Sequence, residues 1–410
     1  MRFLLSASPA ERRVLLASTL GWMLDGMDVT LYAMVIAELL RELHLSTAQA
    51  GLLASVTLIS SAVGGILFGI LADRAGRRVA LMASIVVYSV FTAACGFSRG
   101  VLDLAVFRFL LGLGMGGEWA TGAALVAETW RPEHRGKALG LMQSGFAIGY
   151  ALAAVVTALI LPRWGWRAVF FVGIVPALLT LWIRRGVQES PHWVHQAAAD
   201  AGNTDGWCRR FRSAVKSHGK IILLTLLMNS AALFGWWGLF TWIPPYLVLP
   251  ATEGGRGLTL AASSAWIIVM QVGMWLGYVS FGILSDAWGR KKTYVGYLLL
   301  ASALVPLYAH AESAAALLVL GPLVAFFGTG HFTGFGIITA ELFPTSFRAS
   351  AMGLTYNFGR ALSAAAPWVL GAMAAHRSLS SAFWISGLAF LVAGLLALGV
   401  PETRDRGALG

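Results

Sequence analysis

Apolar residues along this chain fall into twelve long blocks that are separated by short polar segments. Each block is long enough to cross a hydrocarbon core about 30 Å thick as a helix. The blocks are continuous, whereas the strands of a membrane barrel alternate apolar and polar residues. The pattern therefore predicts an all-α membrane protein with spans near residues 14–40, 47–72, 78–97, 101–127, 137–161, 166–183, 219–249, 261–285, 293–311, 314–340, 350–375 and 380–400.

Composition and charge agree with a membrane protein that binds no nucleic acid. Hydrophobic residues make up 58% of the 410 and charged residues only 12%, against about 25% in a soluble domain. The net charge is +11, but of the 30 Lys and Arg six fall in expected external loops, two inside expected helices and 22 on one side. This is the positive-inside pattern, and it predicts a multi-pass protein of the cell membrane with both termini cytoplasmic. If the source is a bacterium, this would be the inner membrane. The basic run at 209–220 is typical of a lipid-surface anchor.

The remaining composition excludes several other classes. Residues 1–13 are short and basic and lead directly into the first block without a cleavage site, which predicts a retained helix instead of a signal peptide. Two cysteines, Cys95 and Cys208, build neither a disulfide framework nor a metal site. No nucleophile–base constellation or nucleotide-binding loop is visible, so we expect neither an enzyme nor a cofactor.

An internal repeat recurs at a constant offset of 213 residues. The segment Gly69–Arg78 recurs as Gly282–Lys291, and isolated positions such as Glu128 and Glu341 keep the same spacing. One offset across most of each half predicts two parallel repeats about an axis along the membrane normal. We expect one six-helix bundle over 1–185, a cytoplasmic linker over 186–218 and a second bundle over 219–410, with no need for a partner subunit.

These motifs resemble the major facilitator superfamily over nearly the whole chain. Its loop signature after helices 2 and 8 is present twice, in the two segments of the repeat, and Arg108 with Gly112 matches its fourth-helix pattern. Residues 401–404, Pro-Glu-Thr-Arg, are similar to its usual end of helix 12. The resemblance implies the major facilitator fold, with twelve transmembrane helices in two pseudo-symmetric bundles, and transport by alternating access through a central cavity.

Within the superfamily, the first and fourth helices resemble particular branches. Asp25-Gly-Met-Asp28 is similar to the motif of the aromatic-acid and sialate-type proton symporters, and residues 116–119 resemble the sialate and lactate-type branch. Helix 7 lacks the His and Asp of fungal lactate permeases, and helix 5 lacks the proline motif of drug antiporters. The resemblance implies a small organic acid carried with protons.

Charged residues inside the expected helices are candidates for proton coupling, because an intramembrane charge costs about 2.5–3.5 kcal/mol. Asp25 and Asp28 share a face of helix 1, and Glu118 is a candidate for the proton path. Arg108 and Asp28 lie at similar expected depths, which predicts an Asp28–Arg108 ion pair. This pair is either a static bridge or one that loosens on protonation.

Arg360 is the main candidate for binding the substrate. It lies near the middle of helix 11, its repeat counterpart is Ala147, and no acid of the second half's helices shares its depth. An unpaired guanidinium that lines a cavity is suited to a carboxylate. The alternative is an Arg360 paired with Asp25. Other candidates are polar or aromatic residues of the inner helices, for which helix packing is the alternative: Asn229, Trp237, Gln143, Tyr356, Asn357 and His331, the last at the repeat position of Glu118.

A third group of charges lies at the expected cytoplasmic ends. In the superfamily the loop-signature aspartates pair with neighbouring arginines and face the N-terminus of helix 11 or 5, where the helix dipole favours an anion. The resemblance implies a gate latch that forms when the cytoplasmic side shuts. The candidates are Asp73, Arg77, Glu128, Asp286, Arg290 and Glu341.

Three functions are compatible with these patterns. The first is proton-coupled symport of a small organic anion, a carboxylate. The second is proton-coupled export of drugs or organic cations, in which the acids of helix 1 bind the cation. The third is a non-transporting membrane sensor, which the lack of a signalling domain disfavours.

Overall fold

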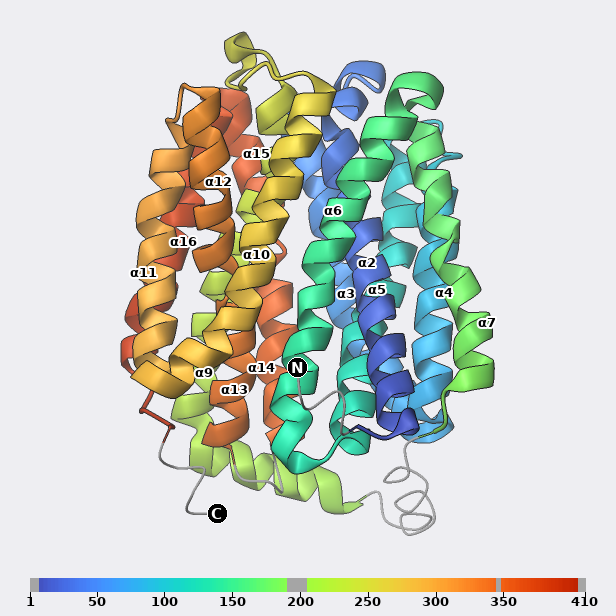
Figure 1. Ribbon diagram of the computed structural model, residues 1–410, viewed down its shortest axis with the longest axis vertical. Helices are drawn as coiled ribbons and strands as arrows, with labels where there is room; N and C mark the ends of the chain where they lie inside the picture. The colour runs from blue at the N-terminus through green and yellow to red at the C-terminus, as the bar shows by residue number, and fades with distance from the viewer. Residues whose placement is uncertain (1–6, 190–204, 344–347, 405–410) are drawn as a thin grey trace.

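The computed structural model describes residues 7–189, 205–343 and 348–404, and these residues form a bundle of long helices that lie side by side (Figure 1). Chain order gives α2 (Pro9–Glu42), α3 (Thr47–Ala75), α4 (Arg77–Cys95), α5 (Val101–Thr129), α6 (Pro132–Phe171) and α7 (Pro176–Gly186), followed by α9 (Asp205–Val248), α10 (Leu260–Trp288), α11 (Arg290–Ala309), α12 (Ala314–Thr329), α13 (His331–Leu342), α14 (Arg348–Ser363), α15 (Ala366–His376) and α16 (Leu379–Leu398).

The helices begin and break where the sequence provides caps and hinges. Ser8 and Ser46 form capping boxes with Glu11 and Gln49 at the starts of α2 and α3, which satisfies orphan amides there. Within α6, Gly165 has φ 72° and ψ 176°, a backbone conformation that glycine adopts without a Cβ penalty. This kink falls between the fifth and sixth predicted blocks.

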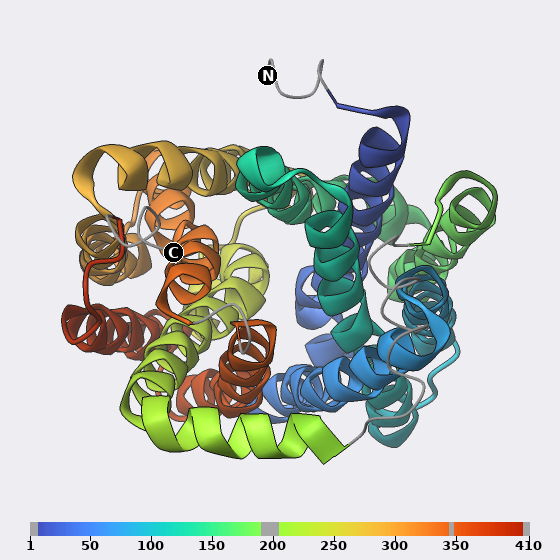
Figure 2. The ribbon, with the colours of Figure 1, turned by 90° about the horizontal axis from the view of Figure 1, so that it is seen from below.

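The two halves of the chain form two adjacent groups of helices. In Figure 1, α2–α7 lie on the right and α9–α16 on the left, and α2 begins and α16 ends at the lower end. The predicted linker over 186–218 is partly helical, since α9 begins at Asp205. The first part of α9 runs across the underside of the molecule (Figure 2).

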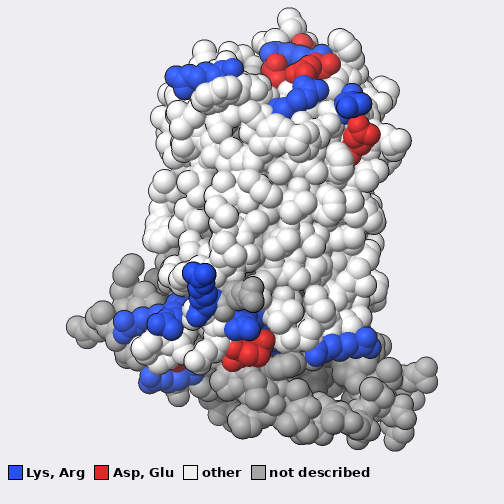
Figure 3. All heavy atoms as spheres, turned by 90° about the vertical axis from the view of Figure 1, so that its right-hand side faces the viewer, with Lys and Arg blue, Asp and Glu red and all other residues white. Residues whose placement is uncertain are grey.

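The surface and the helix lengths agree with a membrane location. Lys, Arg, Asp and Glu gather at the two ends of the face shown in Figure 3, and the band between them carries none. Among the described residues, seven helical segments are long and apolar enough to cross a membrane. Helices satisfy their backbone hydrogen bonds internally, as a bilayer requires. The uncharged band between the two ends fits the hydrocarbon region of the membrane.

The repeat predicted at an offset of 213 residues is present in three dimensions. Gly76 has φ 105° and ψ 152°, and Gly289 has φ 103° and ψ 149°. Each glycine ends one helix and begins the next, because its left-handed backbone reverses the chain without a side-chain clash. The same sequence signature therefore builds the same turn in both halves.

The two halves touch at the end of the molecule opposite the start of α2. The Thr47 hydroxyl in α3 donates to the carbonyl of Gly371 in α15 at 2.7 Å. The backbone N–H of Trp368 donates to the Ser55 hydroxyl at 3.2 Å. A methyl group on Gly51 would collide with the carbonyl of Pro367. These contacts between α3 and α15 join the two halves at the expected external end.

Candidate functional site

Three acidic side chains are buried inside the first half. Asp25 and Asp28 come from α2 and Glu118 from α5, and each is at most 1% exposed. Asp25 interacts electrostatically with both other acids, and the Glu118 carboxyl packs against Gly21 of α2. One oxygen of Asp25 and both oxygens of the other two lack a hydrogen-bond partner. The structure thus brings together three of the residues that the sequence predicts for proton coupling.

The two aspartates of α2 face different surroundings. Asp25 interacts electrostatically with Arg360 of α14, in the other half, although no ion pair joins them. Asp28 lies beside Thr92 of α4, but the Thr92 hydroxyl donates to the Tyr88 carbonyl at 2.8 Å. The Asp25 carboxyl is therefore the acid of this pair that acts across the interface, and Asp28 lies inside the first half.

The predicted Asp28–Arg108 ion pair is wrong. The Arg108 guanidinium lies over the ring of Tyr32, 3.7 Å from its centroid, and its Nε donates to the Leu53 carbonyl at 3.0 Å. Tyr32 is four residues beyond Asp28, which is one helical turn, or about 6 Å, further along α2. Arg108 is thus displaced outward by one turn, where the face of an aromatic ring attracts the cation.

Arg360 lies at the interface of the two halves and is 2% exposed, but it is not among the residues that line the cavity with Arg108. Its Nη2 donates to the Tyr356 hydroxyl at 3.2 Å, and its Nε has no partner. The two predicted alternatives were an unpaired Arg360 and an Arg360 paired with Asp25. The structure lies between them, because Arg360 is close enough to Asp25 for an electrostatic interaction but forms no ion pair with it. The guanidinium retains a free donor.

An aromatic stack joins the halves beside Arg360. The rings of Trp119 in α5 and Tyr356 in α14 stack with centroids 4.2 Å apart and an interplanar angle of 19°. Trp119 Nε1 donates to Gln143 Oε1 at 2.9 Å. The structure therefore gathers the predicted residues Gln143, Tyr356 and Arg360 around Trp119. Trp119 is not among the predicted site residues, and its place next to Glu118 in the motif at 116–119 is the signal in the sequence that points to it.

The two predicted asparagines lie at helix contacts. Asn357 of α14 packs against Gly65 of α3, across the interface, and its Nδ2 donates to the Gly353 carbonyl at 3.0 Å. Asn229 of α9 donates weakly to the Thr355 carbonyl at 3.4 Å and packs against Gly359. Asn357 thus shares the interface with Arg360, whereas Asn229 joins α9 to α14 within the second half.

His331 lies apart from the interface. It is fully buried in the second half, with ring contacts to Tyr294, Phe332 and Phe390, and neither ring nitrogen has a hydrogen-bond partner. This surrounding agrees with the packing alternative for His331. Trp237, by contrast, lines a cavity between the halves.

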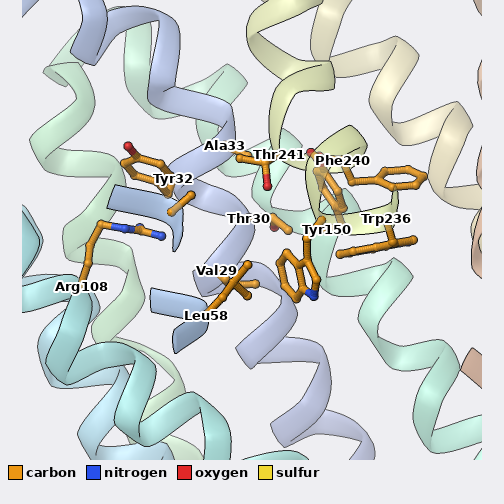
Figure 4. Close-up of a pocket in the computed structure, with 12 residues that line it drawn as sticks. Val29, Thr30, Tyr32, Ala33, Leu58, Arg108, Tyr150, Trp236, Phe240 and Thr241 are labelled. Atoms are coloured by element: carbon orange, nitrogen blue, oxygen red, sulfur yellow. The ribbon is translucent and has the colours of Figure 1, made fainter. Parts of the chain in front are cut away.

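That cavity extends from Arg108 to an aromatic wall on α9 (Figure 4). Arg108 and Tyr32 lie at one end, and Trp236, Phe240 and the Tyr150 ring lie at the other. The Tyr150 hydroxyl of α6 donates to the Phe240 carbonyl at 2.8 Å, which joins the two halves. A mostly apolar space with a few polar groups is the usual composition of a small-molecule site.

The charged clusters at the expected cytoplasmic ends contain the same arginine–glutamate ion pair in both halves. Nε of Arg77 lies 3.3 Å from Glu128, and Nε of Arg290 lies 3.3 Å from Glu341. Arg290 also pairs with Asp286. Each of these pairs lies within one half, and the Asp73 side chain lies outside the described residues.

Glutamates of the same repeat cap the helices that follow the two loop signatures. The carboxyl of Glu189 accepts the backbone N–H of Arg77 at 2.9 Å, and that of Glu402 accepts the backbone N–H of Arg290 at 2.8 Å. An anion at a helix N-terminus is stabilised by the helix dipole and the free amides there. These charged residues therefore tie each loop signature to its own half.

Comparison with known proteins agrees with this architecture. The Major Facilitator Superfamily model matches residues 19–281 and 247–409. The sialic acid transporter NanX of Escherichia coli is 30% identical over 96% of this chain and 94% of that protein. The cis,cis-muconate transport protein of Acinetobacter baylyi is 29% identical over 94% of this chain and 93% of that protein.

Solved structures show the same fold. The crystal structure of a D-xylose-proton symporter superposes with a TM-score of 0.77 over 97% of this chain and 99% of that chain, at 20% identity. The helices, the repeated loop signature and the matched family model point to one conclusion. This chain is a membrane transporter, not an enzyme, and it belongs to the major facilitator superfamily.

Proposed function

We propose that this protein is a secondary active transporter that carries a small organic anion, a carboxylate, together with protons by alternating access. The observation that carries the proposal is Arg360, a buried guanidinium at the interface with a free Nε and an acid, Asp25, within electrostatic reach. A guanidinium binds a carboxylate through charge-assisted, often bidentate hydrogen bonds. The relatives named for sialic acid and muconate support an organic acid as substrate.

The acids of the first half would carry the proton. A buried carboxylate without donors is costly when it is charged, so Asp25, Asp28 and Glu118 are suited to binding protons as the surroundings change. Asp25 faces Arg360. An anion that binds Arg360 would weaken the attraction between the Arg360 guanidinium and the Asp25 carboxylate. Anion binding and proton uptake would then favour one another, which is symport.

The remaining residues would shape the path and the gates. Gln143, Tyr356 and Asn357 surround the Arg360 site, while Trp237 lines the cavity beyond it, and Asn229 and His331 support the second half. The charged clusters of Arg77 and Arg290 would hold each loop signature to its own half, so a gate role for Asp73 and Asp286 would require further contacts between the halves when the cytoplasmic side closes. We also infer twelve spans in two pseudo-symmetric bundles, a bacterial inner-membrane location with cytoplasmic termini, and a monomer that requires no cofactor.

Uptake into proteoliposomes under an imposed pH gradient tests the proposal. We expect an inward proton gradient to drive accumulation of an organic acid such as benzoate, but not of the cation tetraphenylphosphonium. Asp28→Asn should abolish gradient-driven uptake. Arg360→Ala should raise the KM about tenfold or more, because a hydrogen bond to a charged group contributes about 1.5–3 kcal/mol.

An exposed arginine provides the matched control. Arg163 lies at the surface, and Arg163→Ala should leave the KM unchanged. Normal gradient-driven uptake in both Asp28→Asn and Arg360→Ala would exclude the mechanism. Transport of the cation against the gradient would favour the antiporter instead, in which the buried acids bind the substrate.

A further inference from the structure

The cavity at Arg108 contains a fixed charge that the proposed coupling does not use. Arg108 is 1% exposed, and its Nη1 has no hydrogen-bond partner. Its neighbours are the Tyr32 ring and the Leu53 carbonyl, and no ion pair with an acid is present among the described residues. Because a guanidinium stays protonated in proteins, Arg108 is a permanent buried cation with one free donor.

The opposite end of the same cavity is aromatic. The rings of Trp236 and Phe240 stack with centroids 4.9 Å apart, and Trp237 meets Trp236 edge to face at 4.7 Å. In Figure 4, Arg108 lies at the left and Trp236 and Phe240 at the right, with Thr30 and Thr241 in the region between them. Flat rings and a cation at the two ends of one space match a molecule with a planar body and an anionic head.

The cavity lies on the external side of the Arg360 site. Its lining residues on α2 begin at Val29, four residues beyond Asp25, which is about 6 Å at 1.5 Å per residue. Asp25 lies within electrostatic reach of Arg360. The contact between Thr47 and Gly371 closes the molecule further out. A solute that enters from outside would therefore pass the Arg108 cavity before it reaches Arg360.

We propose that Arg108 and the aromatic wall of α9 form a second carboxylate-binding subsite, on the external side of Arg360, for a planar organic acid. The inference rests on the proposed function only in taking an organic anion as the solute. The guanidinium Nη1 would donate to the carboxylate, and the planar body would lie against Trp237 and Phe240. The cavity is narrow while α3 and α15 are in contact, and it would widen when the external ends of the halves separate.

Cysteine labelling at Thr241 tests the subsite independently of transport. The reporter is Thr241→Cys in a Cys208→Ser background, since Cys95 is buried, and Ala33→Cys is a second reporter if the first does not fold. Impermeant anionic and cationic methanethiosulfonates are applied from outside to the reconstituted protein. We expect the anionic reagent to react about tenfold faster, because a buried cation concentrates anions in a cleft, and benzoate to slow the reaction.

Substitutions of the two arginines identify the source of the charge. Arg108→Gln should remove both the preference for the anionic reagent and the protection by benzoate, and Arg108→Lys should retain much of the preference. Arg360→Gln should leave the preference intact. Loss of the preference in Arg360→Gln but not in Arg108→Gln would overturn the subsite, and so would reporters that remain unlabelled from outside.

The subsite and the proposed function fail in different ways. Suppose that labelling of Thr241→Cys shows no preference for the anionic reagent and no protection by benzoate, while the protein still accumulates benzoate under a pH gradient. This result would exclude the subsite and leave the symporter proposal standing. Protection by benzoate through Arg108, without gradient-driven uptake of any organic acid, would retain the subsite and remove the symporter.

Discussion

Trp119 of the first half stacks on Tyr356 of the second, with ring centroids 4.2 Å apart. Tyr356 in turn accepts a hydrogen bond from Arg360 at 3.2 Å. The position of the proposed carboxylate-binding guanidinium therefore depends on a contact between the halves. If this stack separates during the proposed alternating access, Arg360 loses part of its support at the same time.

Trp119→Ala should weaken transport more than Trp119→Phe. An aromatic pair contributes about 0.5–1.5 kcal/mol beyond its burial, and the upper part of that range corresponds to about tenfold in an equilibrium constant. We expect the alanine variant to raise the KM for an organic acid by about three- to tenfold, and the phenylalanine variant, which loses only the hydrogen bond to Gln143, to raise it less. Initial rates in proteoliposomes measure both, and equal KM values for the two would contradict a role for the stack.

Two glycines of α3 should respond differently to substitution. Gly51 meets Pro367 across the halves, whereas Gly64 meets the backbone of Leu113 of α5 within the first half. Gly64→Val should lower the free energy of unfolding by about 1–3 kcal/mol, because it overpacks the contact between α3 and α5 within the first half. Gly51→Val should retain stability but disfavour the state in which the external side is closed.

Reagent access separates the two glycine variants. External labelling of a cysteine at Thr241 should be faster in Gly51→Val than in the parent, and unchanged in those Gly64→Val molecules that fold. A Gly51→Val protein as unstable as Gly64→Val, with unaltered labelling, would mean that α3 and α15 do not separate during transport.

Glu402 should stabilise the protein in a pH-dependent way. Partial burial raises the pKa of its carboxyl. The hydrogen bonds from the backbone N–H groups of Arg404, Arg290, Thr403 and Lys291 lower the pKa by more, so it lies below the ordinary value. A lowered carboxyl pKa contributes stability that is present above the unfolded pKa of about 4.3 and is lost as the pH falls through the folded value.

Glu402→Gln measures this contribution. We expect a loss of about 0.3–1 kcal/mol at pH 7, because Glu402 is exposed and solvent screens its charge, and a smaller difference from the parent as the pH falls below about 4. Thermal unfolding in detergent across this pH range is the measurement, with exposed Glu312 changed to Gln as the control. A constant difference at every pH would indicate that the charge of Glu402 is not responsible.

Asp28 and Arg108 should behave as independent residues. Because no ion pair joins them, the stability changes of Asp28→Asn and Arg108→Gln should add within about 0.5 kcal/mol. A double-mutant cycle of thermal unfolding tests this. Substantial rescue in the double variant, relative to Arg108→Gln alone, would show that the two charges compensate one another.

Helix positions and the repeat were predictable because both are local properties of the chain. The length of an apolar block is limited by the thickness of the bilayer, and the 213-residue offset is visible in the residues themselves. The turns at Gly76 and Gly289, and the ion pairs of Arg77 and Arg290, follow the repeat closely. The same logic could not anticipate the broken helices α12–α13 and α14–α15, whose interruptions lie inside apolar blocks.

The site was predicted only in part, because depth in the membrane does not fix direction around a helix. Depth alone predicted Arg108 beside Asp28. In the structure Arg108 lies over the ring of Tyr32, one helical turn away from Asp28. Arg360 was identified from its isolation in the second half, but the nearness of Asp25 and the stack with Trp119 required two helices from different halves.

The sequence by itself determined that this chain is a two-fold repeated, all-helical membrane protein with ionisable residues inside its helices, since hydrophobic length, charge bias and internal similarity need no neighbours. Only the tertiary structure decided which of those residues meet. Partners such as Asp25 and Arg360 are hundreds of residues apart along the chain, and the packing of α2 against helices of the other half sets the distance between them.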